Sequence, residues 1–177
     1  MTTRRQFLQL TAGAAGALLA PTAFAGTAPH GERVLRFYNL HTGEHLKATY
    51  WADGAYVPEE LAAVNYVLRD FRSGDVAHMD RRLLDLLYAL QYKLQQPGTF
   101  DIISGYRSPA TNAELRRTTG GVAKHSLHME AKAADIRMPG VALADLRRAA
   151  LSLHAGGVGY YPDSDFVHVD TGRPRFW

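Results

Sequence analysis

Two stretches of the sequence place histidine and aspartate where they can act together. The first is SLHMEAKAADIRM, which carries His128 and Asp135 seven positions apart around a run of small residues. The second is DFVHVDT, in which His168 and Asp170 alternate with valines, so that a strand would bury the valines and point the polar pair to the other face. Because an unpaired buried charge costs several kcal/mol, this pattern favours a polar cleft in which the two stretches meet.

Two imidazoles and one carboxylate form a metal site if His128, Asp135 and His168 converge. Three protein ligands leave one position for water, which is typical of catalytic rather than structural zinc. Such a water can reach a pKa of about 7 and supply hydroxide at neutral pH. Asp170 is expected to accept the proton of this water and pass it to a leaving amine, and Asp165 competes for that role. The alternative is an ordinary turn and strand whose polar side chains are solvated.

Three further residues are candidates for substrate binding. Arg107, in SGYRSPATN, follows a strand-like run and precedes a helix start. Its planar guanidinium can pair with a substrate carboxylate, whereas the alternative is a surface arginine bonded to the helix cap. His125 and Ser126 lie close to His128 along the chain and are expected to border the same cleft.

The periodicity of the sequence predicts the elements around these residues. Residues 32–51 alternate in hydrophobicity and predict a hairpin with a loop of four or five residues, expected as a peripheral ribbon. Apolar residues at three- and four-residue steps predict helices between Pro58 and Gly74 and between Met79 and Pro97. Four short strands are then expected at 99–104, 132–138, 156–161 and 165–171, with a helix at 142–154. This mixture predicts an α+β fold with a small antiparallel or mixed sheet and helices packed on one face.

Residues 1–25 differ from the rest of the chain and predict an export signal. They carry Arg4 and Arg5 ahead of an apolar stretch and end in Ala-Phe-Ala, which is typical of the bacterial twin-arginine route. A membrane anchor is the alternative, but the apolar stretch is far shorter than the roughly 20 residues that a span requires. Removal of the signal would leave residues 26–177 as one domain in the periplasm, expected to be a monomer without a membrane span.

Composition and charge exclude other classes of protein. The 177 residues contain no cysteine, so no disulfide framework is present. The formal net charge is +3 and falls to about +1 without the two arginines of the export signal, which is too small for a nucleic-acid-binding surface. After removal of the signal, about 150 residues would remain, which is enough to bury a sizeable core without disulfide cross-links.

Three stretches carry a resemblance to a known family of peptidases. The similarity lies in SGYRSPATN, KHSLHMEAKAAD and GGVGYYPDSDFVHVDTGRPRFW. The chain resembles the zinc peptidases with the hedgehog/D-Ala-D-Ala-peptidase fold, also called LAS-type metallopeptidases, and most closely the murein endopeptidase K group. Their signature S-x-H-x-x-G-x-A-x-D, followed by a later histidine, fits Ser126, His128, Ala133 and Asp135. Ala131 replaces the glycine, a change that the loop is expected to tolerate if its φ is negative.

This resemblance implies a cofactor, a substrate and an activity. It implies Zn²⁺ bound by His128, Asp135 and His168, and hydrolysis of peptide bonds in the stems or cross-links of peptidoglycan. It also makes the arginine of SGYR a substrate anchor. For the base, related peptidases place a glutamate where this chain has Asp165, whereas the closer group favours Asp170, which is the assignment expected here.

Two other functions share some of these features. Two histidines and a carboxylate also form the iron site of non-haem Fe(II) oxygenases, and His168-Val169-Asp170 has their H-x-D pattern. In those enzymes a further histidine follows, which this chain lacks, and the expected strands are too few for a double-sheet jelly roll. The other alternative is a cell-wall binding module that hydrolyses nothing, although such a module has no need of an open metal position.

Overall fold

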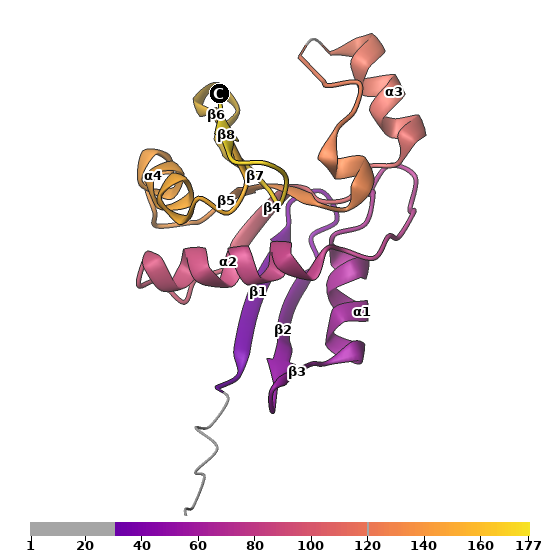
Figure 1. Cartoon of the computed structure of the whole chain (residues 1–177). Helices are drawn as coiled ribbons and strands as arrows, with labels where there is room; N and C mark the ends of the chain where they lie inside the picture. Colours follow the sequence, from indigo (N-terminus) through magenta and orange to yellow (C-terminus); the bar gives the residue numbers. More distant parts are fainter. Residues whose placement is uncertain (1–30, 120) are drawn as a thin grey trace, which may run out of the picture.

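A single mixed sheet organises the molecule. The computed structural model describes residues 31–119 and 121–177, and the expected export signal lies outside these residues. Eight strands form the sheet in the order β3-β2-β1-β4-β5-β7-β6-β8 (Figure 1). They are β1 (Arg33–Asn39), β2 (His45–Ala52), β3 (Ala55–Tyr56), β4 (Phe100–Ser104), β5 (Ala133–Arg137), β6 (Gly157–Tyr161), β7 (Phe166–Asp170) and β8 (Arg175–Phe176). The pairs β1/β4 and β6/β8 are parallel and the other neighbouring pairs are antiparallel.

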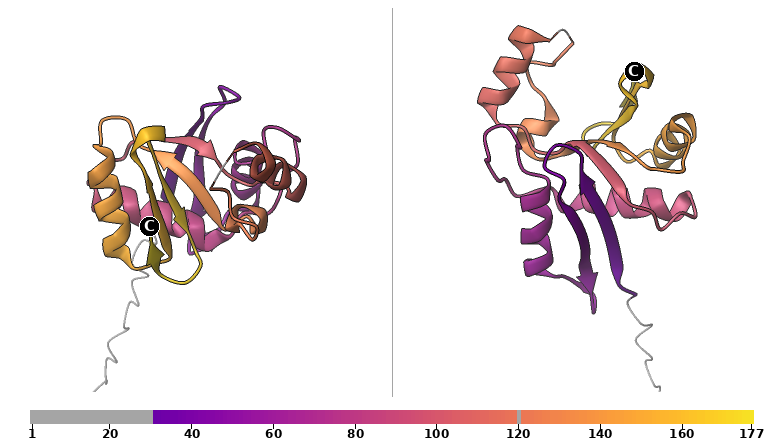
Figure 2. Two further views of the ribbon diagram at one scale, coloured as in Figure 1. Left: turned by 90° about the horizontal axis from the view of Figure 1, so that it is seen from above. Right: turned by 180° about the vertical axis from the view of Figure 1, so that it is seen from behind.

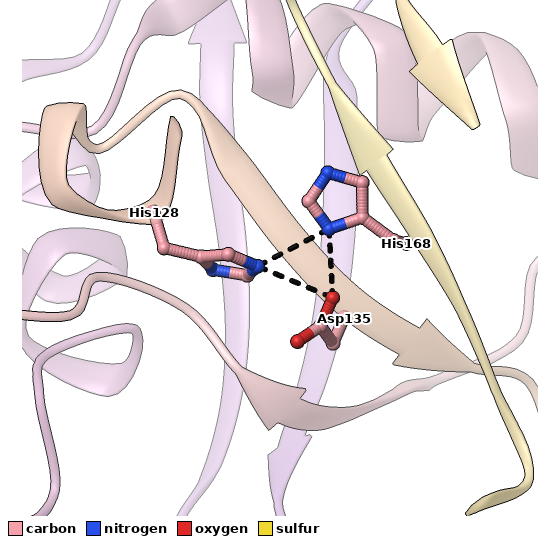
Figure 3. Close-up of side chains that lie close together, drawn as sticks. All are labelled: His128, Asp135 and His168. Atoms are coloured by element: carbon pink, nitrogen blue, oxygen red, sulfur yellow. Dashed lines mark hydrogen bonds and ion pairs between the residues drawn. The ribbon is translucent and has the colours of Figure 1, made fainter. Parts of the chain in front are cut away.

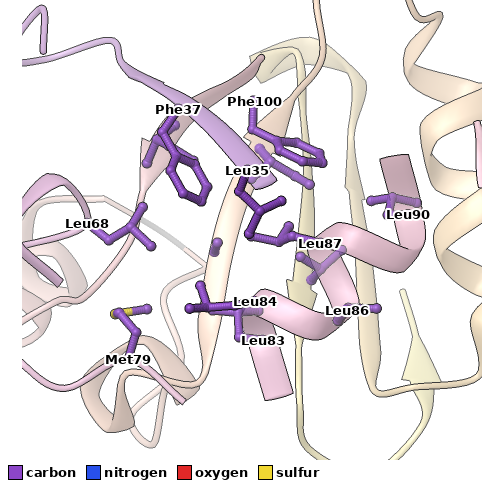
Figure 4. Close-up of a cluster of buried hydrophobic side chains, with 14 of the residues drawn as sticks. Leu35, Phe37, Leu68, Met79, Leu83, Leu84, Leu86, Leu87, Leu90 and Phe100 are labelled. Carbon is purple, nitrogen blue, oxygen red and sulfur yellow. The ribbon is translucent and has the colours of Figure 1, made fainter. Parts of the chain in front are cut away.

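Of the four α-helices in the described part of the chain, three cover one face of this sheet. The helical elements are α1 (Pro58–Val67), α2 (Arg81–Lys93), α3 (Pro109–Thr118), α4 (Leu143–Leu153) and two 3-10 turns, η1 (Leu127–Glu130) and η2 (Pro162–Ser164). Buried side chains of α1, α2 and α4 pack against the sheet in one hydrophobic core (Figure 4). α3 stands clear of these three helices (Figure 1 and the right view of Figure 2). The expected α+β fold with helices on one face is confirmed, and no described helix is long and apolar enough to cross a membrane.

The predicted N-terminal hairpin is confirmed, but its expected peripheral position is wrong. β1 and β2 pair antiparallel and are joined through residues 40–44. β1 also pairs in parallel with β4, so the hairpin belongs to the central sheet. The physical reason is that Leu35 and Phe37 are fully buried beneath the helices, with the rings of Phe37 and Phe100 6.5 Å apart between centroids.

α1 ends at Val67, earlier than the apolar periodicity predicts. The carbonyl of Val67 accepts a hydrogen bond from Asn39 Nδ2 at 2.9 Å, and that of Leu68 accepts one from the backbone N–H of Tyr106 at 2.7 Å. These tertiary donors satisfy the carbonyls at the helix end, so the helix need not continue. A Cβ at Gly105 would lie 2.4 Å from the Leu68 oxygen, so only glycine permits this close approach.

The register between β5 and β7 places the polar residues on the uncovered face. Asp135 lies directly opposite His168 in this antiparallel pair. Their neighbours Ala134, Val167 and Val169 point the other way and are fully buried in the core. Since strand residues alternate between faces, the alternation that points the valines into the core directs the polar pair to the opposite face.

Candidate metal centre

Three side chains from three segments meet on the face opposite the core. His128 comes from η1, Asp135 from β5 and His168 from β7 (Figure 3). His128 Nε2 lies 3.2 Å from both Asp135 Oδ1 and His168 Nδ1, and His168 Nδ1 lies 2.9 Å from Asp135 Oδ1. The relative exposure of the three residues is 3%, 6% and 7%, respectively. The structure therefore brings together the three residues that the sequence predicted to converge.

The second nitrogen of each imidazole faces an acceptor. His128 Nδ1 lies 2.7 Å from the carbonyl oxygen of Gly105, and His168 Nε2 lies 3.0 Å from Asp170 Oδ2. Carbonyl and carboxylate oxygens only accept, so in the neutral rings these two nitrogens carry the protons. The lone pairs of His128 Nε2 and His168 Nδ1 then face each other and the Asp135 carboxylate.

A divalent cation fits this donor set. Two lone pairs and a carboxylate oxygen at separations of 2.9–3.2 Å repel one another unless a proton or a metal ion lies between them. Ligand atoms at 2.0–2.1 Å from a tetrahedral ion lie roughly 3.3 Å from one another, close to these separations. The outer hydrogen bonds to Gly105 and Asp170 fix the orientation of both rings, as is usual for histidine ligands. These residues can therefore hold a metal ion.

Hydrogen bonds and opposite charges shift the pKa values of Asp135 and His168. Burial raises the pKa of Asp135, but the charge and hydrogen bonds of His128 and His168 outweigh it and hold the pKa well below its usual range. Burial lowers the pKa of His168, but hydrogen bonds to Asp135 and Asp170 outweigh it and raise the pKa to about 8. Because a ligand nitrogen must be deprotonated, a metal ion competes with this proton below that pH.

Asp170, the expected base, lies behind His168 and does not line the cleft. Its carboxylate is fully buried and accepts backbone N–H bonds from Gly157 and Gly172 at 3.0 and 2.8 Å. Arg175 donates to both of its oxygens, at 3.1 and 2.7 Å. Burial raises the pKa of Asp170, but the hydrogen bonds of His168 and Arg175 and those of the backbone outweigh it and hold the pKa well below its usual range. Strand alternation predicted the correct face, but the carboxylate is used to orient the ring of His168.

Asp165, the other candidate base, also lies away from the three ligands. It follows η2 with a φ of +52° and a side chain that is 61% exposed. Its carboxylate forms an ion pair with Arg137 Nη1 at 2.9 Å. Because the left-handed turn before β7 directs Asp165 outward, its carboxylate does not line the cleft and is not placed to accept a proton there.

The 3-10 turn η1 positions His128. Ser126 caps this turn by accepting the backbone N–H of His128 at 3.4 Å. Ala131, which ends the turn, has a φ of +54°, so the condition of a negative φ is not met. Glycine adopts this conformation freely, whereas the alanine methyl costs roughly 1 kcal/mol there. Ala131 is 3% exposed, so packing of its methyl group in the core offsets part of this cost.

A cleft of about 460 Å³ opens over the three ligands and contains all three expected substrate-binding residues, Arg107, His125 and Ser126. The guanidinium of Arg107 is held loosely. Its Nη2 lies 3.7 Å from Asp135 Oδ2, and its two side-chain hydrogen bonds are long, at 3.4 Å. Burial lowers the pKa of Arg107, and Asp135 opposes this effect. A loosely held cation beside a metal ligand is available to a substrate.

Three residues of the site were not found from the sequence. Tyr161, Arg175 and Trp177 also line the cleft. The stretch that ends in RPRFW contains all three, but the positions of Arg175 and Trp177 depend on the pairing of the two-residue strand β8 with β6. Such a short strand gives no periodic signal, so the sequence did not predict that these side chains line the cleft.

Asp70 supports the segment that carries Arg107. Its Oδ2 accepts the backbone N–H of Ser108 at 2.9 Å and its Oδ1 accepts that of Arg72 at 3.0 Å. Asp70 is 1% exposed. Burial raises its pKa, but hydrogen bonds from Thr111, Ser108 and Arg72 outweigh it and lower the pKa to about 2. The carboxylate thus ties the end of α1 to the start of α3.

Replacing Asp70 with asparagine should destabilise the protein in a pH-dependent manner. The folded-state pKa of about 2 lies below the roughly 3.9 of an unfolded aspartate, so the carboxylate stabilises the fold above about pH 4. That contribution, on the order of 1–2 kcal/mol, is lost as the pH falls toward 2. Denaturant unfolding of wild type and Asp70→Asn should show this gap at pH 7 and a smaller gap near pH 2.5.

The matched control for this change is Asp53→Asn. Asp53 is an exposed residue with a φ of +50°, a conformation that asparagine tolerates. Its replacement should leave the free energy of unfolding within about 0.5 kcal/mol. A difference between Asp70→Asn and wild type that stays constant from pH 7 to pH 2.5 would contradict the role of the charge.

Comparison with known proteins identifies the family. Residues 27–177 match the family described as Peptidoglycan L,D-endopeptidase MepK. The chain belongs to the MepK family. The MepK proteins of Escherichia coli K12 and of Shigella flexneri are each 47% identical to it over 175 residues, covering 98% of this chain and 96% of the relative. A probable MepK of Haemophilus influenzae is 40% identical over 176 residues, covering 98% and 95%. The resemblance to the murein endopeptidase K group is confirmed, and the MepK match spans the entire cleft.

Proposed function

We propose that the protein is a zinc-dependent murein endopeptidase, an enzyme that hydrolyses peptide bonds in peptidoglycan. Membership of a family of peptidoglycan endopeptidases supports the reaction class. The observation that carries the proposal is the convergence of two imidazole lone pairs and one carboxylate oxygen, within 2.9–3.2 Å, at the base of a cleft. An arrangement of three protein ligands open to a cleft suits a catalytic metal and not a structural one.

Zinc is the ion that the ligands favour. Two nitrogens and one oxygen form a borderline set that suits zinc better than the all-oxygen sites of magnesium or calcium. When bound, the ion supplies polarisation of the scissile carbonyl group and a water of lowered pKa. His128, Asp135 and His168 are the proposed ligands, and the Gly105 carbonyl and Asp170 hold the two rings in the ligating tautomers.

The other residues of the cleft bind and orient the peptide. We assign Arg107 to the carboxylate or carbonyl groups of the substrate, because its guanidinium is next to Asp135 and only loosely bonded within the protein. His125 and Ser126 form the adjacent rim. Asp135 is the single acidic side chain among the described residues that line the cleft, so the proposal places no separate aspartate base there.

The family name also favours one type of bond. The relatives are named L,D-endopeptidases. A link between two meso-diaminopimelate residues joins an L centre to a D centre, whereas a link from D-Ala to diaminopimelate joins two D centres. We therefore propose the diaminopimelate cross-link as the substrate.

For a wall enzyme of this kind, we also propose that residues 1–25 direct twin-arginine export to the periplasm and that residues 26–177 form one domain that acts as a monomer.

Digestion of purified sacculi tests this function. The zinc-loaded protein should release muropeptides in which a diaminopimelate link has gained one water, as measured by mass spectrometry. Defined dimers with either type of cross-link then identify the bond. Binding to sacculi without any new product would support the alternative of a non-catalytic wall-binding module, and oxygen consumption by an iron-loaded sample would support an oxygenase.

A further inference from the structure

β6 brings Tyr161 to the same face as the metal ligands and leaves room there for the ring of Trp177. Gly159 lies opposite His168 in the β6/β7 register, and Tyr161 lies opposite Phe166. Since alternate residues of a strand share a face, Tyr161 points to the same side as His168. A Cβ at Gly159 would lie 2.8 Å from the indole ring of Trp177, so the glycine leaves the space that this ring occupies.

Backbone pairing holds Trp177 in this space. The N–H of Tyr160 donates to the carbonyl of Trp177 at 3.1 Å, and the N–H of Trp177 donates to the carbonyl of Val158 at 3.3 Å. The indole ring lies 5.3 Å from the His168 ring, between centroids, and the Arg175 guanidinium lies 4.9 Å from the indole. Trp177 is therefore held by backbone hydrogen bonds and lines the cleft beside the ligands.

The indole determines how the Tyr161 hydroxyl is oriented. Trp177 Nε1 donates a hydrogen bond to the Tyr161 oxygen at 2.7 Å. Because an indole N–H can only donate, the phenolic oxygen is the acceptor and its own proton must point elsewhere. Within residues 31–119 and 121–177 this proton has no acceptor, and the side chain lines the same cleft as Arg107 and Asp135.

We propose that Tyr161 contacts the substrate and donates its hydroxyl hydrogen bond to the carbonyl oxygen of the peptide bond that is cleaved, while Trp177 is a positioning residue for that hydroxyl. This inference rests on the proposed peptidase function. Negative charge develops on the carbonyl oxygen as water attacks, so a preoriented donor stabilises the transition state more than the bound substrate. The hydroxyl keeps its proton throughout and no bond of Tyr161 is made or broken.

Kinetics of Tyr161→Phe provide the first test. This change keeps the ring, which stacks on Phe166 at 4.5 Å between centroids, and removes only the donor. We expect kcat on a cross-linked muropeptide to fall about 100-fold, with KM within about threefold and metal content unchanged. Tyr160→Phe is the matched control, since that neighbour points to the opposite face, where Arg147 lies 4.9 Å from its ring. It should retain wild-type kcat.

A double-mutant cycle tests the positioning role of Trp177. Trp177→Phe should lower kcat about 10-fold in the wild-type background and have almost no further effect in the Tyr161→Phe background, because the hydroxyl that it orients is then absent. Equal kcat for Tyr161→Phe and wild type would overturn the inference while leaving the peptidase function intact. Independent, multiplying effects would overturn the positioning role, and a wild-type protein without products would overturn the function and this inference together.

Fluorescence adds a readout that does not depend on turnover. The sequence has two tryptophans, so Trp51→Phe leaves Trp177 as the single tryptophan emitter. Adding a cross-linked muropeptide to this metal-stripped variant should change the Trp177 emission and yield a dissociation constant. Adding Tyr161→Phe should leave that constant within about threefold, because the proposed bond strengthens only in the transition state. Unchanged emission at saturating muropeptide, or a loss of affinity as large as the loss of kcat, would contradict the inference.

Discussion

His168→Ala should abolish both metal binding and hydrolysis. The change removes one of three ligands and leaves Asp170, a fully buried carboxylate, without its imidazole partner. We expect metal content to fall from about one ion per chain to nearly none, and cleavage of cross-linked muropeptides to fall about 10⁴-fold or more, because polarisation by the metal supplies several kcal/mol of transition-state stabilisation. Elemental analysis and a muropeptide assay on the same preparation measure both quantities.

His45→Ala is the control for this experiment. His45 is an exposed histidine on β2 whose ring stacks on Tyr38 with centroids 4.3 Å apart. Its replacement removes the same chemical group and should leave metal content and activity unchanged. A folded His168→Ala protein that still held one ion and cleaved cross-linked muropeptides at the wild-type rate would contradict the proposed metal centre.

Asp170→Asn should weaken metal binding and destabilise the fold at the same time. Asp170 accepts from His168, Arg175 and two backbone N–H groups, and an asparagine amide would place a donor against these donors. Because the asparagine amide leaves buried donors without a good acceptor, we expect the free energy of unfolding to fall by about 2 kcal/mol. Loss of the partner that orients His168 should lower zinc affinity about 10- to 100-fold.

This second experiment separates a positioning role from the role of a base. Competition with a chromophoric chelator measures the zinc affinity, and thermal unfolding measures stability. A base would affect kcat alone, so unchanged metal affinity and stability in Asp170→Asn would contradict the geometry. Asp165→Asn serves as the control, because its 61% exposed side chain pairs only with Arg137 at the surface. It should leave metal affinity and stability close to wild type.

Two of the three ligands could be predicted because each interrupts an apolar strand pattern. His168 alternates with two valines of β7, and Asp135 lies between Ala134 and Ile136 of β5. Alternation determines the face of a strand with period two, so it gives the common direction of these side chains reliably. It does not give the depth of a carboxylate within that face. For this reason the sequence predicted that Asp170 would face the cleft and accept a proton from water there, whereas its carboxylate lies behind the imidazole ring of His168.

Features that depend on tertiary contacts could not be predicted from the sequence. The end of α1 is decided by donors from Asn39 and Tyr106, which lie far away along the chain. The place of β1 within the sheet depends on its parallel pairing with β4, and parallel pairing leaves no local turn signal. The places of Tyr161 and Trp177 depend on the two-residue strand β8.

The direct pairing of Asp135 with His168 has a consequence for the order of folding. These two ligands are 33 residues apart in the chain, with α4 and β6 between them, and His128 is 40 residues from His168. A slip of one residue between β5 and β7 would turn His168 toward the hydrophobic core and dismantle the ligand set. Under the proposed function, a chain in which β5 and β7 are mispaired would lack the ligand set and, with it, the hydrolytic activity. Activity would then depend on completed pairing of segments that lie far apart in the sequence.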